Sequence, residues 1–394
     1  MSKTISYTIT SKIGLFHNVR VHLYMRKIRV SILTSILFIL FVPQMGNAQD
    51  IEDNEKTEIV DSSNVNNTVL PFLFFLPETG LAFGITGITT FRLPGESYES
   101  RPSQVIYSAA YTLKNQFLSW IPYEIYKDDA RVRYKGELGF YRYFYNFYGI
   151  GNNSLVEDLE NYDVTFPRIE FSYSRSDIDN LFFGGGFKYD NFNITRIDSA
   201  GILFRQEPIG FDGGSKFNLL LNAFYDNRDN IFSTSKGIYA EFRYERSLPF
   251  LFSDFDYWKY TFDVRYFISL KKDLVLANQL FVSSADRNAP FFDLPYVSTP
   301  TYARGFSDRR FINYNIFNLQ SEVRFTMVRR FKGAVFVSSS LVPDTFDEIS
   351  DVSLRYSYGL GIRYEFDKKE KTRFRLDIAY GDTINFYLTA NEAF

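Results

Sequence analysis

Apolar and polar residues alternate with a period of two along most of the chain after position 69, which predicts β-strands. In segment 352–366 every even position is apolar, and every odd position is polar, charged or glycine. Segments 131–143 and 257–269 repeat this pattern. Each predicted strand therefore has one apolar face and one polar face.

The length of these segments favours a membrane wall over a soluble sandwich. They reach the roughly 9 to 11 residues that a tilted membrane strand requires, whereas soluble strands average about 5 to 6. Tyr and Phe gather toward the strand ends on the apolar face, as in the aromatic girdles of membrane barrels. Because every backbone group in lipid must be paired, the sheet has to close. The pattern predicts an all-β fold, a closed antiparallel transmembrane β-barrel.

The strand count gives sixteen. Fifteen segments show the pattern, at 80–93, 104–114, 116–126, 131–143, 166–176, 181–191, 217–226, 238–247, 257–269, 273–284, 316–328, 331–341, 352–366, 373–381 and 384–394. Bacterial single-chain barrels normally have an even number of strands with both ends periplasmic, so we expect a further strand at 69–76. Pro71 within it removes a backbone donor and predicts a poorly paired first strand at the closing seam.

The same parity orients the connections. Short links fall on the periplasmic side, at 176–180, 270–273 and 329–332, and long links face outward, at 144–165, 192–216 and 285–315. The last predicted strand ends in an aromatic residue, Phe394, which looks like the recognition signal of outer-membrane barrels.

The N-terminal region predicts export. Residues 25–48 have a basic start, an apolar stretch at 32–42 and a small-residue cleavage site, as a secretory signal does. Residues 1–24 add nothing that a signal needs, so we expect the true start at Met25. Segment 49–68 is acidic and too poor in apolar residues to bury a core, which predicts a short disordered periplasmic tail. The predicted organisation is an extension and signal peptide at 1–48, this tail, and a barrel at 69–394.

Composition agrees with an outer-membrane protein. Aromatic residues make up 19% of the chain, yet the mean hydropathy is only −0.19. Cleavage after residue 48 leaves 38 basic against 46 acidic residues, a net charge of −8, which argues against nucleic acid as a partner. The chain has no Cys, so it has neither a disulfide nor a lipoprotein anchor.

Several short motifs resemble the BamA/TamA, or bacterial surface antigen, barrel family. Segment 301–306, Thr-Tyr-Ala-Arg-Gly-Phe, followed by Glu-Val-Arg-Phe at 322–325 is similar to the family's Arg-Gly-Phe/Tyr loop and the strand after it. Further similar segments lie at 77–84, 148–152, 226–230 with 236–237, and in the final strands. The resemblance spans about 69–394 and implies sixteen strands, with a sixth outer loop, here 285–315, that folds back into the lumen.

The resemblance also implies roles for particular residues. In the family the loop arginine pairs inside the lumen with acidic residues on neighbouring strands, so Arg304 would meet Glu322, which the alternation points inward. Gly305 and Phe306 would form the tight tip of the loop. Ser338 stands where the family carries an Asp, which would weaken the anchorage. The alternative is that Arg304 and Glu322 are two of many polar residues in a wet channel.

The sequence is compatible with more than one function, and three classes come into question. The resemblance implies a factor that helps protein or lipid assemble at, or cross, the outer membrane through a weak seam. A tail of twenty residues cannot encode a POTRA module, so a separate periplasmic partner would have to replace those modules. Other expected partners are outer-membrane lipids and the barrel assembly machinery that inserts the chain. The alternative is a passive channel or structural barrel with mixed luminal charges.

An enzyme is the third function, and composition argues against it. Both His residues, His17 and His22, precede the predicted signal, so the mature chain would have neither His nor Cys. It would thus lack the usual base for a serine nucleophile, a thiol, and His or Cys metal ligands. We expect no catalytic site and no cofactor.

Overall fold

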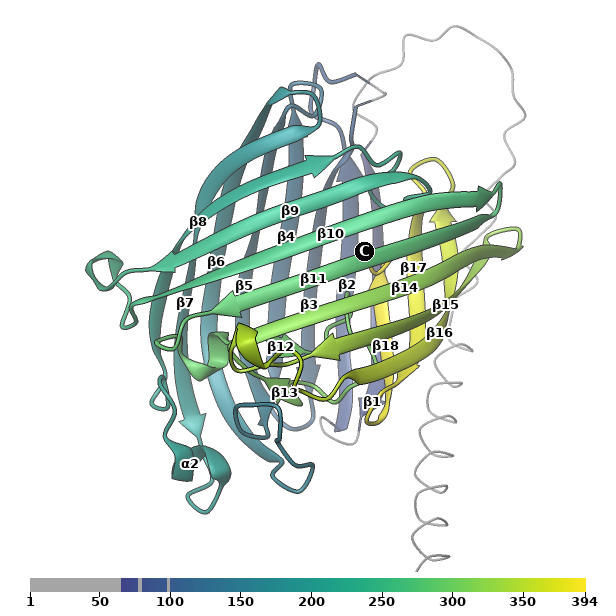
Figure 1. Ribbon diagram of the computed structural model, residues 1–394. Helices are drawn as coiled ribbons and strands as arrows, with labels where there is room; N and C mark the ends of the chain where they lie inside the picture. The colour runs from purple at the N-terminus through teal and green to yellow at the C-terminus, as the bar shows by residue number, and fades with distance from the viewer. Residues whose placement is uncertain (1–64, 77–79, 98–99) are drawn as a thin grey trace, which may run out of the picture.

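The computed structural model describes residues 65–76, 80–97 and 100–394, which form one curved antiparallel sheet of sixteen strands (Figure 1). Neighbours in the sheet are neighbours in the chain, except that a small hairpin of β12 and β13 is inserted between β11 and β14. The strands of the sheet are β1 Asn66–Leu76, β2 Gly80–Phe91, β3 Ser103–Thr112, β4 Phe117–Lys127, β5 Val132–Phe147, β6 Glu160–Ile178, β7 Leu181–Arg196, β8 Gly214–Asp226, β9 Gly237–Ser247, β10 Tyr257–Lys271, β11 Leu274–Ala285, β14 Asn315–Val328, β15 Phe331–Leu341, β16 Arg355–Asp367, β17 Thr372–Tyr380 and β18 Ile384–Ala390.

Sixteen strands lie where the alternation predicted them, and the main differences are at their ends. β5 and β6 extend further than expected, so the link between them shrinks to 148–159. They extend because Phe147 and Tyr162 pack with Phe291 in an aromatic cluster, an interaction that alternation alone does not reveal. β1 begins at Asn66, inside the segment predicted as tail. The predicted signal peptide and most of that tail lie outside the described residues.

The wall has its apolar side outward. In β14 Glu322 is fully buried while Leu319 is 54% exposed, and in β16 Arg363 is fully buried while Leu360 is 56% exposed. Burial of charge together with exposure of leucine is the reverse of a soluble protein and is what a lipid-facing wall requires. The luminal side is therefore where a functional site should be sought.

The two ends of the barrel differ. The end that carries the tight turns, such as those between β10 and β11 and between β14 and β15, is called the short-turn end. The opposite, long-loop end carries α2 Ile202–Gln206 and the 3-10 turns η1 Pro249–Leu251, η2 Phe291–Asp293 and η3 Phe346–Glu348. No helix in the described part of the chain is both long and apolar enough to cross a membrane.

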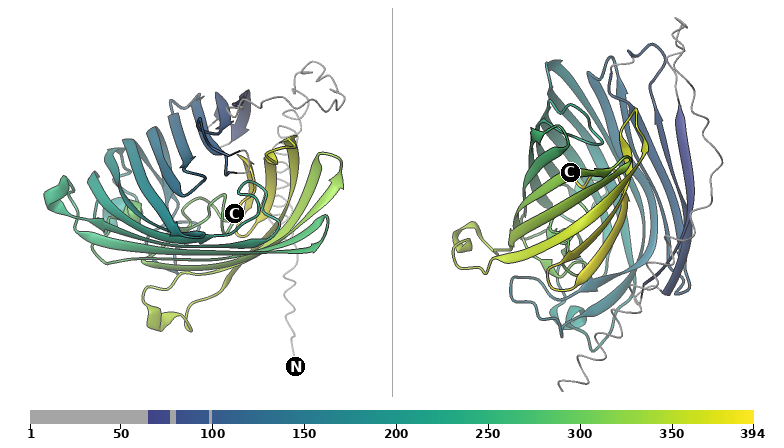
Figure 2. Two further views of the ribbon diagram at one scale, coloured as in Figure 1. Left: turned by 90° about the horizontal axis from the view of Figure 1, so that it is seen from above. Right: turned by 90° about the vertical axis from the view of Figure 1, so that its right-hand side faces the viewer.

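The first and last strands are the free edges of the sheet. Across the described residues, no backbone pairing joins β1 to β18, and Figure 2 (left) shows the purple and yellow strands as separate ends of the curve. The edges approach at the short-turn end, where the Asn66 amide donates to Asp367 at 2.5 Å and Arg92 pairs with Glu370 at 2.9 Å. The sheet thus differs from the closed barrel expected from the sequence.

Two local features lie at the open edge. β18 has seven residues against eleven in β1, because the chain leaves the wall after Ala390 instead of continuing to Phe394. β1 contains Pro71, which cannot donate a backbone hydrogen bond. Pro71 nevertheless stands in register opposite Ile85, so β1 is paired with β2 along its whole length, and its unpaired side faces the seam.

Candidate functional site

The connection between β11 and β14 folds into the lumen and is called the luminal loop, residues 286–314. It contains η2 and the hairpin of β12 (Tyr296–Val297) and β13 (Phe311–Ile312). Its tip carries Arg304 and Phe306, which are 1% and 4% exposed. The predicted sixth outer loop is therefore packed inside the barrel.

Arg304 grips two carboxylates on different strands. Its Nη2 lies 2.6 Å from Glu322 Oε2 on β14, and its Nη1 lies 2.5 Å from Asp377 Oδ2 on β17. The guanidinium also stacks on the Phe336 ring of β15, with 3.5 Å from Cζ to the ring centroid. A planar fork can make two such contacts at once, which a lysine ammonium cannot do with the same geometry. One side chain thus ties the loop tip to three strands.

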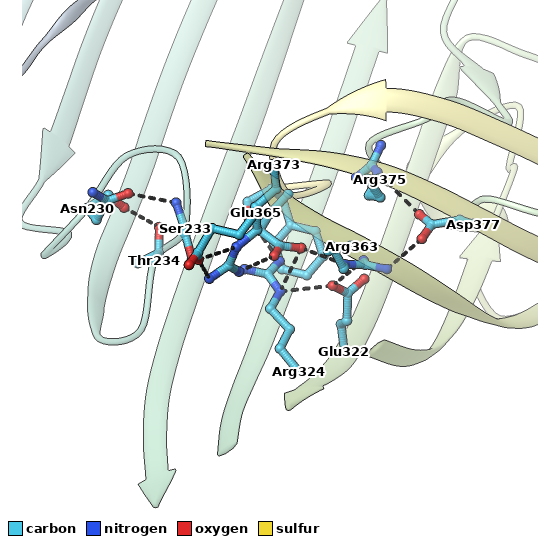
Figure 3. Close-up of polar contacts among 12 residues, drawn as sticks. Asn230, Ser233, Thr234, Glu322, Arg324, Arg363, Glu365, Arg373, Arg375 and Asp377 are labelled. Carbon is cyan, nitrogen blue, oxygen red and sulfur yellow. Dashed lines mark hydrogen bonds and ion pairs between the residues drawn. The ribbon is translucent and has the colours of Figure 1, made fainter. Parts of the chain in front are cut away.

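Arg363 of β16 bridges the same two carboxylates from the wall (Figure 3). Its Nη2 is 3.0 Å from Glu322 Oε1 and its Nη1 is 2.7 Å from Asp377 Oδ1. Arg324 adds a third contact to Glu322, at 2.8 Å. Since Arg304, Glu322, Arg363 and Asp377 have fully buried side chains, each charge depends on its neighbours for compensation. The cluster of these five residues is called the loop clamp.

The chain beyond β18 enters the lumen beside the loop clamp. Glu392 lies 3.0 Å from Arg363 and 2.7 Å from Arg373. Arg373 also pairs with Glu365, at 2.9 Å (Figure 3). Burial opposes ionisation, but the nearby arginines, Arg363 first, hold the pKa of the Glu392 carboxyl below its usual range. Residues 391–394 are therefore held inside the barrel by charge, and we call them the C-terminal segment.

Phe394 lies in the lumen and not on the last strand. It is 5% exposed and packs with Phe267 of β10 and Ala277 of β11. The expectation that Phe394 ends a lipid-facing strand is wrong, because β18 ends at Ala390. Whether Phe394 acts as a recognition signal remains a prediction.

A second anchor holds the other side of the luminal loop. Asp293 in η2 accepts hydrogen bonds from Lys216 Nζ at 2.5 Å and Tyr257 Oη at 2.6 Å, and it lies 3.0 Å from Lys259 Nζ. Burial raises the pKa of the Asp293 carboxyl, but Lys216 and Lys259 outweigh it and keep this pKa well below the usual range. The loop is thus held to β8 and β10 by an acid, Asp293, and to β14 and β17 by a base, Arg304.

The loop tip also touches the edge strand. Gly305 N donates to Tyr387 Oη at 2.9 Å, and Asn385 Nδ2 donates to Phe306 O at 3.0 Å, both from β18. Gly305 has φ +111°, and a Cβ there would stand 2.7 Å from the backbone carbon of Tyr380. Only glycine fits this approach without strain, which gives the predicted Arg-Gly-Phe tip a physical reason.

Ser338 does not serve the loop as the sequence suggested. Its hydroxyl pairs with that of Ser357 at 2.6 Å, and Asp377 supplies the second carboxylate instead. The signal for Asp377 was present, since Arg373, Arg375 and Asp377 occupy alternate inward positions of β17. The signal for Asp293 was not, because its partners come from strands about 35 and 77 residues away in the chain.

Gly361 makes room for the loop clamp, which gives a testable prediction. Replacement by Ala would place Cβ 1.9 Å from Asp377 Oδ1 and 2.2 Å from Arg363 Nη1. We expect Gly361→Ala to lower the free energy of unfolding by about 1–3 kcal/mol, since overpacking displaces the Asp377 carboxylate. In an Asp377→Ala background the cost should shrink, as measured by urea unfolding in a double-mutant cycle. Equal costs in both backgrounds would show that Gly361 acts elsewhere.

Comparisons with known proteins identify the family. A family model described as the Omp85 superfamily domain matches residues 105–385. No curated protein matches the sequence. Among solved structures, BamA from Haemophilus ducreyi lacking POTRA domains 1–3 is similar at 13% identity and a TM-score of 0.55, covering 84% of this chain and 70% of that one. CdiB from Acinetobacter baumannii is similar at 11% identity and a TM-score of 0.51, covering 83% of this chain and 58% of that one. CdiB from Escherichia coli is similar at 8% identity and a TM-score of 0.51, covering 83% of this chain and 60% of that one.

These structural likenesses concern the fold alone, and this chain spans less than two thirds of either CdiB. The family model, by contrast, covers more than half of this chain and runs from β3 to β18. The sixteen-stranded sheet, with apolar residues exposed and charged residues buried, agrees with a membrane barrel. The chain belongs to the Omp85 superfamily and is a bacterial outer-membrane β-barrel protein.

Proposed function

We propose that this protein assists the assembly or translocation of protein or lipid at the outer membrane through a seam between β1 and β18. The observation that carries the proposal is the pair of unpaired edges at the two ends of the described sheet. An edge strand presents a row of free donors and acceptors that can template an incoming strand. In lipid such groups each cost several kcal/mol unless they are paired, so the edge favours a partner. The role is mechanical and needs no catalytic group.

The C-terminal segment supplies the proposed gate. While Glu392 stays with its arginines, β18 ends at Ala390, four residues before the last residue of the sequence. If the segment left the lumen, β18 could lengthen and pair with β1, which would close the barrel. The proposed cycle therefore alternates between a closed barrel and an open seam. The C-terminal segment sets the balance between them.

The luminal loop couples to this gate through direct contacts. Its tip forms hydrogen bonds with Tyr387 and Asn385 of β18. In the loop clamp, Arg304 shares Glu322 with Arg363, and Arg363 also pairs with Glu392 of the C-terminal segment. A displacement of the tip would thus break or shift its hydrogen bonds to the edge strand β18. We propose that a periplasmic partner delivers the cargo to the short-turn end. Outer-membrane lipids and the machinery that inserts this barrel complete the expected partners.

A disulfide across the seam tests the proposal. Because the natural sequence has no Cys, Val69→Cys can be combined in turn with Cys at 386, 387 or 388 to find the register that crosslinks. We expect the oxidised pair to abolish rescue of a strain that lacks the protein, and a reductant to restore it. The matched control is Val323→Cys with Val335→Cys, which face each other within the wall between β14 and β15. Full rescue by the seam-locked barrel would refute the seam mechanism.

A further inference from the structure

The connection between β9 and β10, residues 248–256, presents two phenylalanines to the outside. Phe250 is 76% exposed and Phe252 is 82% exposed, the two highest values among the large apolar side chains of the described chain. Pro249 beside them is also exposed. A soluble surface would carry such rings at a cost, because apolar area in water is unfavourable.

The phenylalanines stand on a rigid base. The turn η1 closes with Leu251 N donating to Leu248 O at 2.9 Å. Ser253 Oγ lies 2.6 Å from Ser247 Oγ. Asp254 is tied to the start of β8, with Ser215 N donating to its carboxylate at 2.7 Å. The backbone that carries the rings is thus held in place, which lowers the entropy lost on binding.

The connection continues the lipid-facing surface of its own strands. Trp258 and Tyr260 stack at 5.4 Å and share the outward face of β10 with Phe262, which is 43% exposed. Trp and Tyr on that face are typical of the membrane interface. The pair of Arg246 and Asp256, 2.5 Å apart, provides charge at the same level. Figure 2 (left) shows the connection projecting sideways from the wall.

We propose that residues 249–252 form a membrane anchor that inserts Phe250 and Phe252 into the boundary between headgroups and acyl chains around the long-loop end. We expect lipid to cover the two rings because they continue the lipid-facing side of β10. The aromatic and charged residues between them and Phe262 are of the kinds found at the membrane interface. The sheet order places β9 and β10 half-way around from the edges β1 and β18. The anchor therefore fixes the wall opposite the seam. This inference goes beyond the proposed function and does not depend on it.

Single-cysteine spin labelling tests the anchor. The full chain is folded into vesicles of phosphatidylethanolamine and phosphatidylglycerol with Phe250→Cys or Phe252→Cys, and collision rates with oxygen and with a water-soluble nickel complex are measured. Leu221→Cys, on a 60% exposed lipid-facing site of β8, is the membrane control. Glu157→Cys, exposed in the link between β5 and β6, is the aqueous control.

We expect the labels at 250 and 252 to behave like the label at 221. The ratio of the oxygen to the nickel collision rate should be several-fold higher there than at 157. A pattern like that of Glu157 would overturn the proposal, because the tip would then lie in water. Shielding from both agents would also overturn it and would point to a protein contact, including a second copy of this chain. Electrophoretic mobility before and after heating verifies that each variant is folded.

Discussion

Glu322→Ala is expected to lower the free energy of unfolding by about 3–5 kcal/mol, because it removes the acid on which three buried guanidinium groups depend. Glu322 lies 2.6 Å from Arg304, 2.8 Å from Arg324 and 3.0 Å from Arg363. Without it, Asp377 and Glu392 are the remaining side-chain carboxylates in contact with these arginines in the described structure. Arg324 also donates a hydrogen bond to Phe394 O at 3.0 Å. Urea unfolding of the barrel in lipid vesicles measures the effect.

Two further variants make this experiment specific. Glu322→Gln keeps the shape of the side chain but loses the charge, so its cost should fall between the wild type and the Ala variant. Asp163→Ala breaks an exposed pair with Arg196, which are 38% and 65% exposed, and should cost less than about 1 kcal/mol because water screens the pair. If Glu322→Ala cost no more than Asp163→Ala, the loop clamp would have no energetic role.

The wall of this barrel was predictable from the sequence because its physics is local. A strand with a period of two exposes its faces to two different media, so the positions of Leu319 and Glu322 on opposite faces followed from parity alone. Arg304 and Glu322 were paired in advance on the basis of a family resemblance. The structure brings them within 2.6 Å.

The rest of the site depends on which inward positions meet across the lumen. Asp377 and Arg363 stand on neighbouring strands, and their contact with Arg304 requires the loop to be folded inward. Asp293 meets Lys216 and Lys259 only because the sheet curves, which no single-strand pattern encodes. The inward turn after Ala390 was missed because Phe394 restores an apolar residue at an even position, although Glu392 interrupts the alternation. The ion pairs of Glu392 and the packing of Phe394 against Phe267 and Ala277 hold that segment in the lumen.

The two anchors of the luminal loop predict a non-additive effect on conductance. Arg304 holds the loop to the wall that includes β14 and β17, and Asp293 holds it to β8 and β10. Because either anchor alone keeps the loop inside, Arg304→Ala and Asp293→Asn should each leave the lumen obstructed. The double variant should loosen the loop, although Phe291 still packs with Phe147 and Tyr162, and should give a larger conductance in planar bilayers than either single variant. Stability losses should instead add, since the anchors share no partner.

The anchors can be removed without leaving isolated charges. After Arg304→Ala, Arg363 still bridges Glu322 and Asp377, and after Asp293→Asn, Lys216 keeps Asp190 at 3.1 Å. Folding of the double variant is therefore expected, which makes conductance a test of loop position. If the Arg304→Ala variant conducted as much as the double variant, Asp293 would not anchor the luminal loop. Large, steady conductance of the wild type would instead favour a passive channel, because a loop that already leaves the lumen open cannot couple cargo to the seam.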